Sequence, residues 1–167
     1  MKVTLYIAIS LDGFIARKNK SVDWLDKYND LGEDFGYAKF YESIDTVVLG
    51  NTTNNQFSNA YADKNCYVFS RTKKGKQKKS IYVNSSPSKF LETLPKDTNV
   101  WLVGGANLVN QFLKKNLIDE FIITIIPTFL GGGIRLFEED NKELSLERIN
   151  TTTYDCGVVQ ITYKINE

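Results

Sequence analysis

The chain has 167 residues, of which 42% are hydrophobic and 25% are charged. This length and composition are typical of one globular domain with a hydrophobic core, so we expect a single domain over residues 1–167. Its 21 Lys and Arg residues nearly balance its 20 Asp and Glu residues, and the net charge of +1 argues against nucleic acid and anionic membranes as partners.

The chain contains no histidine, which excludes several kinds of active site. Catalysis by Ser-His-Asp or Cys-His arrangements and metal sites built on imidazole are ruled out, so a proton donor must be Asp, Glu, Tyr, Lys, Cys or water. Cys66 and Cys156 form no metal-binding cluster, and isolated thiols are typical of a reducing compartment. We therefore expect a cytoplasmic protein without a bound metal. No segment reaches the roughly 20 apolar residues of a membrane span.

Short runs of β-branched and apolar residues predict eight strands along the chain. They cover residues 3–9, 46–49, 66–69, 81–83, 100–103, 121–126, 146–152 and 158–165. Apolar residues at helical spacing predict helices over residues 34–44, 88–94 and 106–115. This alternation is typical of an α/β domain with parallel strands, whereas the short connections after residue 121 favour antiparallel pairing at one edge of the sheet.

Two glycines, Gly104 and Gly105, join the strand over residues 100–103 to the helix over residues 106–115. A helix N-terminus presents free N–H groups and the positive end of the helix dipole, and glycine lets an anion approach the backbone closely. The junction therefore indicates a phosphate site, although an ordinary strand-to-helix turn explains the two glycines equally well.

Two other strand ends carry polar residues of the same kind. They are Gly50-Asn51-Thr52-Thr53 and Ser70-Arg71-Thr72. If the three strands are parallel, their ends meet at one edge of the sheet and outline a groove for a dinucleotide with an extra phosphate. The five lysines over residues 73–79 are better explained as a solvated loop than as a phosphate site.

Five short motifs occur in a specific order along the chain. They are SLDGFIA at residues 10–16, Gly50-x-x-Thr53, Ser70-Arg71-Thr72, VGGA at residues 103–106 and PxxLGGG at residues 127–133. In this order the chain resembles dihydrofolate reductase-like proteins, particularly the reductase domain of bacterial riboflavin biosynthesis and its stand-alone relatives. The resemblance spans nearly the whole chain. It implies a three-layer α/β fold in which helices flank a mixed, mostly parallel eight-stranded sheet.

The resemblance also implies a reductase that transfers a hydride from a nicotinamide cofactor, NADPH or alternatively NADH, to a small heterocycle. The substrate would be pterin-like or aminopyrimidine-like, as in dihydrofolate reduction or the 5-amino-6-(5-phosphoribosylamino)uracil reductase step of riboflavin biosynthesis. By the same analogy we expect a homodimer, in which the apolar segments 121–126 and 158–165 meet the partner.

Carried over by position, the resemblance implies a cofactor site at the ends of these motifs. The set is Ala8, Ile9, Gly13, Gly50, Thr52, Thr53, Ser70, Arg71, Thr72, Gly104, Gly105, Ala106 and Asn107. In relatives the glycine pair holds the pyrophosphate, and the positions of Arg71 and its two neighbours contact the adenosine 2'-phosphate. Ala8 and Ile9 would line the nicotinamide, and Gly13 would be the hinge of a loop that closes over the site.

Hydride transfer to a C=N or C=C bond leaves an anion, so a proton donor is needed near the substrate. Asp34 is the predicted donor, because it opens the helix over residues 34–44, where dihydrofolate reductases keep their active-site acid. An N-cap role explains the same aspartate, and Glu33 is an adjacent alternative. Asp12 is a further candidate, although a turn position suits it better.

Two positions depart from the family pattern. Asn51 stands where relatives commonly have an arginine that binds the 2'-phosphate, which leaves the choice between NADPH and NADH open. Tyr6 and the Asn54-Asn55 segment stand where the riboflavin-pathway enzymes have a lysine and Asp-Asp-Pro, so the substrate is open as well. The alternative hypothesis is a non-catalytic nucleotide- or ligand-binding protein that retains the fold.

Overall fold

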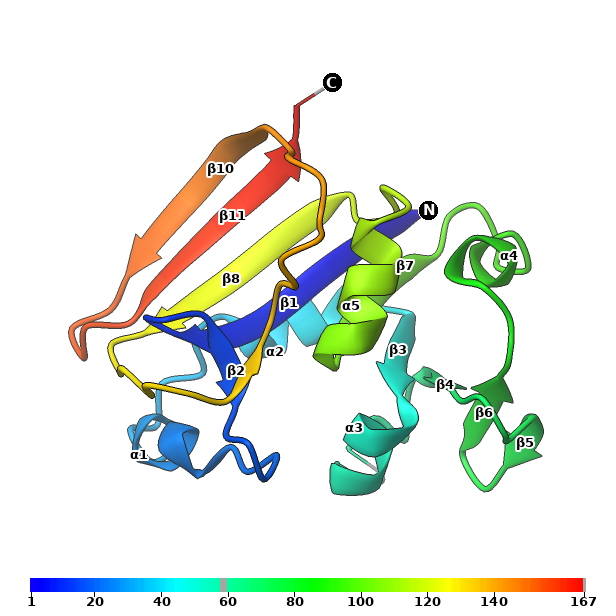
Figure 1. Cartoon of the computed structure of the whole chain (residues 1–167), viewed down its shortest axis with the longest axis horizontal. Helices are drawn as coiled ribbons and strands as arrows, with labels where there is room; N and C mark the ends of the chain where they lie inside the picture. Colours follow the sequence, from blue (N-terminus) through cyan, green and yellow to red (C-terminus); the bar gives the residue numbers. More distant parts are fainter. Residues whose placement is uncertain (58–59, 167) are drawn as a thin grey trace.

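Within residues 1–57 and 60–166, which the computed structural model describes, nine strands form the central sheet (Figure 1). Across the sheet the order is β10 (Leu146–Thr153), β11 (Val159–Ile165), β8 (Glu120–Ile126), β1 (Lys2–Ser10), β7 (Asn99–Gly104), β3 (Thr46–Gly50), β4 (Asn65–Phe69), β6 (Ser80–Val83) and β5 (Gly75–Gln77). The strands from β8 to β6 in this order are parallel, whereas β10, β11 and β5 are antiparallel to their neighbours. The predicted mixed, mostly parallel sheet is confirmed.

The eight predicted strands are all present, with ends that differ by at most one residue from the prediction. The ninth strand, β5, comes from the lysine-rich segment, for which the composition predicts a loop. Gly75 and Lys78 have φ angles of 77° and 54°, and these turns let the segment fold back and pair with β6. The sheet therefore has one strand more than the eight that the resemblance implies.

Helices cover both faces of the sheet and complete three layers (Figure 1). They are η1 (Asp23–Leu25), α1 (Asp26–Asn29), α2 (Tyr37–Glu42), α3 (Asn51–Gln56), α4 (Pro87–Leu91) and α5 (Ala106–Leu113). On the face of α4 and α5, Phe112 packs with Leu5 and Leu102 in a buried cluster. On the face of α2, a second cluster holds Val47 and Trp101. None of the described helices is long and apolar enough to span a membrane.

The first predicted helix starts later than the sequence suggests. α2 begins at Tyr37 rather than at Asp34, because Phe35 and Gly36 have φ angles of 52° and 78°, in the left-handed region. Asp34 therefore lies in the turn before the helix. The other two predicted helices are present as α4 and α5, which both end earlier than predicted.

A second, two-stranded sheet pairs β2 (Phe14–Ala16) with β9 (Ile134–Arg135). Sequence periodicity predicts neither strand, because two or three residues are too few for an alternation to show. The pairing joins the loop after β1 to the segment after β8. Gly133 allows this close approach, since a Cβ at this position would lie 2.2 Å from the Ala16 carbonyl oxygen.

Replacing Gly133 with alanine is expected to destabilise the fold by about 2–3 kcal/mol, because the added Cβ meets backbone atoms and the φ angle of 152° suits glycine. Urea unfolding measures the change. Gly132→Ala is the matched control, since a Cβ there would meet only the Lys18 side chain, at 3.8 Å. Equal stability of the two variants would contradict the tight contact at Ala16.

Candidate active site

The carboxyl ends of three parallel strands lie side by side, as the sequence predicts. β7, β3 and β4 are neighbours in the sheet, so the turns that follow them meet at one edge. A Cβ on Gly50 would lie 3.8 Å from the Gly105 nitrogen, and one on Gly105 would lie 3.4 Å from the Thr53 hydroxyl oxygen. The Gly104–Gly105 peptide bond is cis. The backbone after β7 thus lies directly against the start of α3.

These turns form part of a groove with a volume of about 980 Å³, at the upper end of the range for cofactor sites. The predicted residues that line it are Ala8, Gly50, Thr52, Thr53, Ser70, Arg71, Thr72, Gly105, Ala106 and Asn107. Ile9, Gly13 and Gly104 are not part of this lining. Ile9 instead packs against the core cluster under α5, on the opposite face of β1 from Ala8.

The turn after β4 is held by its own hydrogen bonds. The Ser70 hydroxyl oxygen accepts from the backbone N–H groups of Thr72 at 3.3 Å and Lys73 at 3.1 Å. The Asn84 side-chain amide donates to the Arg71 carbonyl oxygen at 2.8 Å. These contacts fix the backbone of the turn and leave the Arg71 side chain exposed beside the groove.

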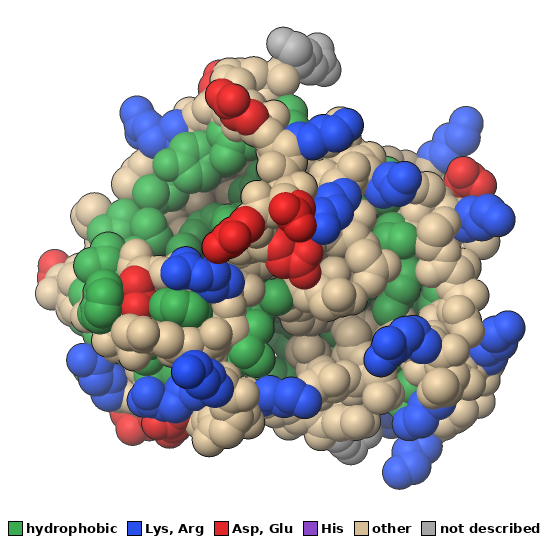
Figure 2. Space-filling view, in the orientation of Figure 1, with side chains coloured by type: hydrophobic (Ala, Val, Ile, Leu, Met, Phe, Trp, Pro, Cys, Tyr) green, Lys and Arg blue, Asp and Glu red, His purple; other side chains and the backbone are tan. Residues whose placement is uncertain are grey.

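Lys and Arg side chains are spread around most of the rim of the face seen in Figure 2, including the lower part where α3 and the β5–β6 hairpin lie in Figure 1. Asp and Glu side chains gather near the centre, over the segment that joins β9 to β10. Of the described basic residues, Lys20 and Arg71 line the groove, whereas the five lysines over residues 73–79 do not.

A second cavity, here called the hollow, adjoins the groove at β1. It has a volume of about 480 Å³ and is lined by Tyr6, Ala8, Leu25, Tyr28, Asn29, Gly32, Glu33, Asp34, Phe35, Tyr37, Thr124 and Ile126. Tyr6, Ala8 and Leu25 also line the groove, so the two cavities meet at these three side chains. The volume and the aromatic walls suit a planar heterocycle.

A polar cluster links the sheet to the turn before α2. Gln160 donates from its Nε2 to the Thr124 hydroxyl oxygen at 2.9 Å and to the Phe35 carbonyl oxygen at 3.1 Å. The Tyr6 hydroxyl donates to the same carbonyl oxygen, also at 3.1 Å. Burial raises the pKa of Tyr6 to about 12, so this hydroxyl stays protonated at neutral pH. The cluster therefore fixes the turn over residues 32–36 against the hollow.

Asp34 lies on the hollow, and its carboxylate caps the start of α2. Its oxygens accept hydrogen bonds from the backbone N–H groups of Ala38 at 3.0 Å and Gly36 at 2.9 Å. These bonds hold the pKa of Asp34 below its usual value, so the carboxylate is ionised at neutral pH. The neighbouring Glu33 accepts from the Phe35 N–H at 3.1 Å. The capping contacts are thus present, and the role of Asp34 as a proton donor stays a prediction.

Asp12 connects two loops beside the cavities. Its two carboxylate oxygens accept from the backbone N–H groups of Leu130 at 3.0 Å and Gly131 at 2.8 Å, and the Ser10 hydroxyl donates to it at 2.6 Å. Desolvation opposes ionisation of this carboxyl, but the three hydrogen bonds outweigh it and lower the pKa of Asp12. Asp12 is therefore a clasp between the loop after β1 and the turn after β8, in addition to the turn residue that the sequence suggests.

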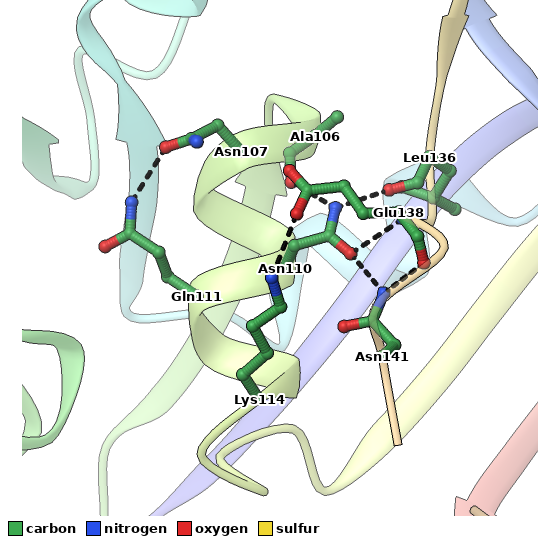
Figure 3. Close-up of polar contacts among 8 residues, drawn as sticks. All are labelled: Ala106, Asn107, Asn110, Gln111, Lys114, Leu136, Glu138 and Asn141. Atoms are coloured by element: carbon green, nitrogen blue, oxygen red, sulfur yellow. Dashed lines mark hydrogen bonds and ion pairs between the residues drawn. The ribbon is translucent and has the colours of Figure 1, made fainter. Parts of the chain in front are cut away.

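A buried asparagine ties α5 to the segment after β9 (Figure 3). Asn110 is 1% exposed, and its Nδ2 donates to the carbonyl oxygens of Ala106 at 2.7 Å and Leu136 at 2.9 Å. Its Oδ1 accepts from the Glu138 N–H at 3.1 Å and from the Asn141 amide at 2.6 Å. Because both polar atoms of this side chain are paired, the helix at the groove is fixed relative to the segment that contains β9.

Two polar residues that hold the wall of the hollow, Thr124 on its lining and Gln160 behind it, are absent from the sequence-based prediction. Thr124 is 5% exposed and lies opposite Ala8 on β1 and Gln160 on β11 in the register of the sheet. Thr124 could have been noticed from the sequence, because it is a polar residue within an otherwise apolar strand. No local pattern marks Gln160, because its partner Phe35 is 125 residues away in the sequence.

Comparisons with known proteins match almost the entire chain. The profile of the RibD C-terminal domain family matches residues 1–160. The protein YwjB of Bacillus subtilis (strain 168) is 42% identical over 170 residues, which cover 97% of each chain. The crystal structure of a proposed riboflavin biosynthesis protein from Shewanella sp. PV-4 has a TM-score of 0.88 at 32% identity and covers 100% of each chain. Dihydrofolate reductase from Enterococcus faecalis, complexed with NADP(H), shares the fold, with a TM-score of 0.70 at 15% identity over 99% of this chain and 97% of its own.

The clasp at Asp12 predicts a specific dependence of stability on pH. Because the folded-state pKa of Asp12 is lowered, its contribution is present above the unfolded-state pKa of about 3.9 and is lost as the pH falls through the folded-state value. We expect Asp12→Asn to lower Tm at pH 7, and the difference from the wild type to shrink below about pH 4. Circular dichroism melts at a series of pH values measure this difference. Asp97→Asn, at an exposed position, is the control, and a Tm difference for Asp12→Asn that stays constant with pH would contradict the clasp.

Proposed function

The chain belongs to the RibD C-terminal domain family, and we propose that it is a nicotinamide-dependent reductase of a pterin-like or aminopyrimidine-like heterocycle. The observation that carries this proposal is that the groove and the hollow meet at Tyr6, Ala8 and Leu25. A dinucleotide in the groove and a heterocycle in the hollow would face each other there. Direct hydride transfer requires such a contact between cofactor and substrate.

The groove suits a nicotinamide dinucleotide because glycines line it just before α3 and α5, where an anion can approach the backbone closely. Gly105 precedes α5, and a Cβ on it would lie 3.4 Å from the Thr53 hydroxyl oxygen. The first N–H groups of a helix have no partner within the helix, and the helix dipole adds a partial positive charge. We assign Gly105, Ala106 and Thr53 to the pyrophosphate. When bound, NADPH supplies the hydride.

The cofactor's 2'-phosphate is assigned to the turn after β4. Arg71 and the hydroxyl of Thr72 lie on the groove there, and the Arg71 guanidinium takes part in none of the ion pairs among the described residues. Asn51, at the start of α3, carries no charge. Arg71 therefore supplies the positive charge that would discriminate NADPH from NADH.

The loops around the groove would position the cofactor and exclude water. Ile15 and Ala16 of β2, which follows the loop after β1, line the groove directly. This loop is held on its far side by the clasp at Asp12 and by a hydrogen bond from the Leu136 N–H to the Gly13 carbonyl oxygen at 3.1 Å. Gly13 has a φ angle of 87°, which suits the hinge role that we propose for it.

Asp34 is the residue that we assign to proton transfer on the substrate. Because its pKa is lowered, only a small protonated fraction is available at neutral pH.

The ionised state of Asp34 also favours the second candidate function, a non-catalytic protein that binds a nucleotide or another ligand in the same fold. Oxidation of NADPH with a pterin or an aminopyrimidine would support the reductase. Binding of both ligands without oxidation would support the second candidate.

We also propose that the chain forms a homodimer in the cytoplasm. β8, which the sequence suggests as part of the contact, lies inside the sheet between β1 and β11 and has no free edge. The edge strand on this side is β10, where the side chains of Leu146 and Ile149 are 40% and 49% exposed. A partner that covers β10 would remove these apolar groups from water.

The free thiols of Cys66 and Cys156 support the proposed cytoplasmic location, because free thiols are typical of a reducing compartment.

Arg71→Ala is expected to weaken NADPH binding about tenfold and to leave NADH binding unchanged, because only NADPH carries the phosphate assigned to the guanidinium. Quenching of tryptophan fluorescence or energy transfer to the nicotinamide measures both dissociation constants. Arg148→Ala, which removes an exposed arginine on β10, is the control. Equal weakening of both cofactors by Arg71→Ala would contradict this assignment. Failure of the wild type to bind either cofactor at millimolar concentration would overturn the reductase proposal.

Asp34→Asn is expected to lower kcat by about 100-fold while NADPH affinity stays unchanged, because the side chain keeps its size but loses the proton. In the wild type, kcat should rise as the pH falls, since the lowered pKa of Asp34 makes its protonated form scarce at neutral pH. This rise should be absent in the variant. Stopped-flow measurement of NADPH oxidation between pH 5 and pH 8 (about the usual stability range) gives kcat and its dependence on pH for both proteins. Unchanged turnover in Asp34→Asn would remove Asp34 from the mechanism.

A further inference from the structure

We propose that the heterocycle reduced at this site carries no phosphate group, in contrast to the phosphoribosyl pyrimidine of riboflavin biosynthesis. The inference rests on the proposed function, in which the hollow holds the substrate. Its starting point is the charge of the lining. Among the described residues of the hollow, the ionisable ones are Tyr6, Tyr28, Glu33, Asp34 and Tyr37, and neither Lys nor Arg occurs.

The two cavities differ in the groups that they offer to an anion. The groove has the side chains of Lys20 and Arg71 and the N-terminus of α5, which are the usual partners of phosphate. The hollow has two carboxylates and three phenols on its described lining. A phosphate that leaves water for the hollow would thus lose hydration without gaining a charged partner. The charges of the two linings therefore favour phosphate groups in the groove and disfavour them in the hollow.

The carboxylates of the hollow are fixed in position. Asp34 is held by the N–H groups of Gly36 and Ala38, and Glu33 is held by the N–H group of Phe35. The turn that carries both is in turn anchored to the sheet through the Phe35 carbonyl oxygen. These bonds keep the two carboxylates on the turn that lines the hollow, where they repel an anion. Both side chains are exposed, so water and salt weaken this repulsion.

The charge of Asp34 acts on nearby phenols, including Tyr6, whose hydroxyl bonds to the adjacent Phe35 carbonyl oxygen. Tyr6 lies on β1, and burial is the main cause that raises its pKa, with a further contribution from the Asp34 charge. The pKa of Tyr154, behind Phe35, is raised by burial and also by the charges of Glu33 and Asp34. The same negative charge acts on any anionic ligand placed in the hollow.

One basic residue beside the hollow has another contact. Lys27 belongs to α1, and its ammonium group lies 4.7 Å from the centre of the Tyr28 ring. This cation–π contact holds the charge against the ring, and Lys27 is not among the lining residues of the hollow. If Lys27 did contact a phosphate group of the ligand, replacing it with alanine would weaken binding of the phosphorylated ligands.

The hollow instead suits a neutral or cationic amino-heterocycle. Fixed carboxylates accept hydrogen bonds from ring N–H and amino groups, while the rings of Tyr28, Phe35 and Tyr37 offer apolar surface to a planar ligand. Such a ligand fits a volume of about 480 Å³. Any sugar or side chain attached to the ring is expected to be uncharged where it passes the turn over residues 32–36.

Two matched ligand pairs test the proposal without any need for turnover. They are 5-amino-6-(ribosylamino)uracil with its 5'-phosphate, and dihydroneopterin with its monophosphate. Isothermal titration of the NADP⁺-saturated protein gives the four dissociation constants. The unphosphorylated member of at least one pair is expected to bind, and at least tenfold more tightly than its phosphorylated partner.

Charge variants show whether the hollow is the cause of this preference. Glu33→Lys is expected to reduce the ratio of the dissociation constants of the phosphorylated and unphosphorylated ligands to about one, or to invert it. Glu92→Lys makes the same change in net charge at an exposed position directly after α4 and should leave the ratio unchanged. Lys27→Ala should also leave it unchanged. Far-ultraviolet circular dichroism verifies that each variant is folded.

Three results would overturn the proposal. They are equal or tighter binding of the phosphorylated ligands to the wild type, selective loss of phosphorylated-ligand binding in Lys27→Ala, and failure of all four ligands to bind. The proposed function has a separate test, because it fails when the protein binds neither NADPH nor NADH. In that case the same ligand pairs are titrated on the protein alone, where the preference of the hollow is measured independently of the cofactor.

Discussion

The site depends on the position of β1 in the middle of the parallel sheet. β1 is paired on one side with β7 and on the other with β8, and this double pairing fixes the direction of each of its side chains. Tyr6 and Ala8 therefore line the hollow, whereas Leu5 is buried in the core under α5. Since β7, β3 and β4 continue the parallel order, their carboxyl ends meet beside β1 and form the groove. The contact between the two cavities is a consequence of this strand order.

Interactions between segments far apart in the sequence hold the surroundings of β1 in place. The clasp at Asp12 and the close approach of Gly133 to Ala16 join the loop after β1 to the segment after β8. Asn110 joins that segment to α5 through bonds that satisfy its whole side chain. Gln160 joins the far strand β11 to the turn that carries the carboxylates of the hollow. The groove and the hollow are thus bounded by backbone that is tied down at several points, which suits a site that must align two ligands.

The sequence predicts the strands and the groove well because both follow from local pattern. Each strand end with its glycines and hydroxyl residues is a short motif, and parallel order alone brings the motifs together. The differences from the prediction have two kinds of cause. Ile9 packs against the core on the other face of β1 from Ala8, which the two-residue alternation of the strand already indicates. The position of the turn before α2 has a long-range cause. The turn at Phe35 shifts the helix start away from Asp34, and the partner that holds this turn, Gln160, is 125 residues away in the sequence. No local pattern contains that information.

If the groove and the hollow meet at Ala8, a bound nicotinamide ring lies against the Ala8 methyl group, and nuclear magnetic resonance can detect this contact. The protein is labelled with ¹³C in its alanine methyl groups, NADPH is added, and nuclear Overhauser effects from the nicotinamide protons are recorded, with Ala8→Gly used to assign the Ala8 methyl signal. We expect effects between the nicotinamide ring protons and the Ala8 methyl group. Effects to other alanines alone, with none to Ala8, would place the ring elsewhere and contradict this expectation.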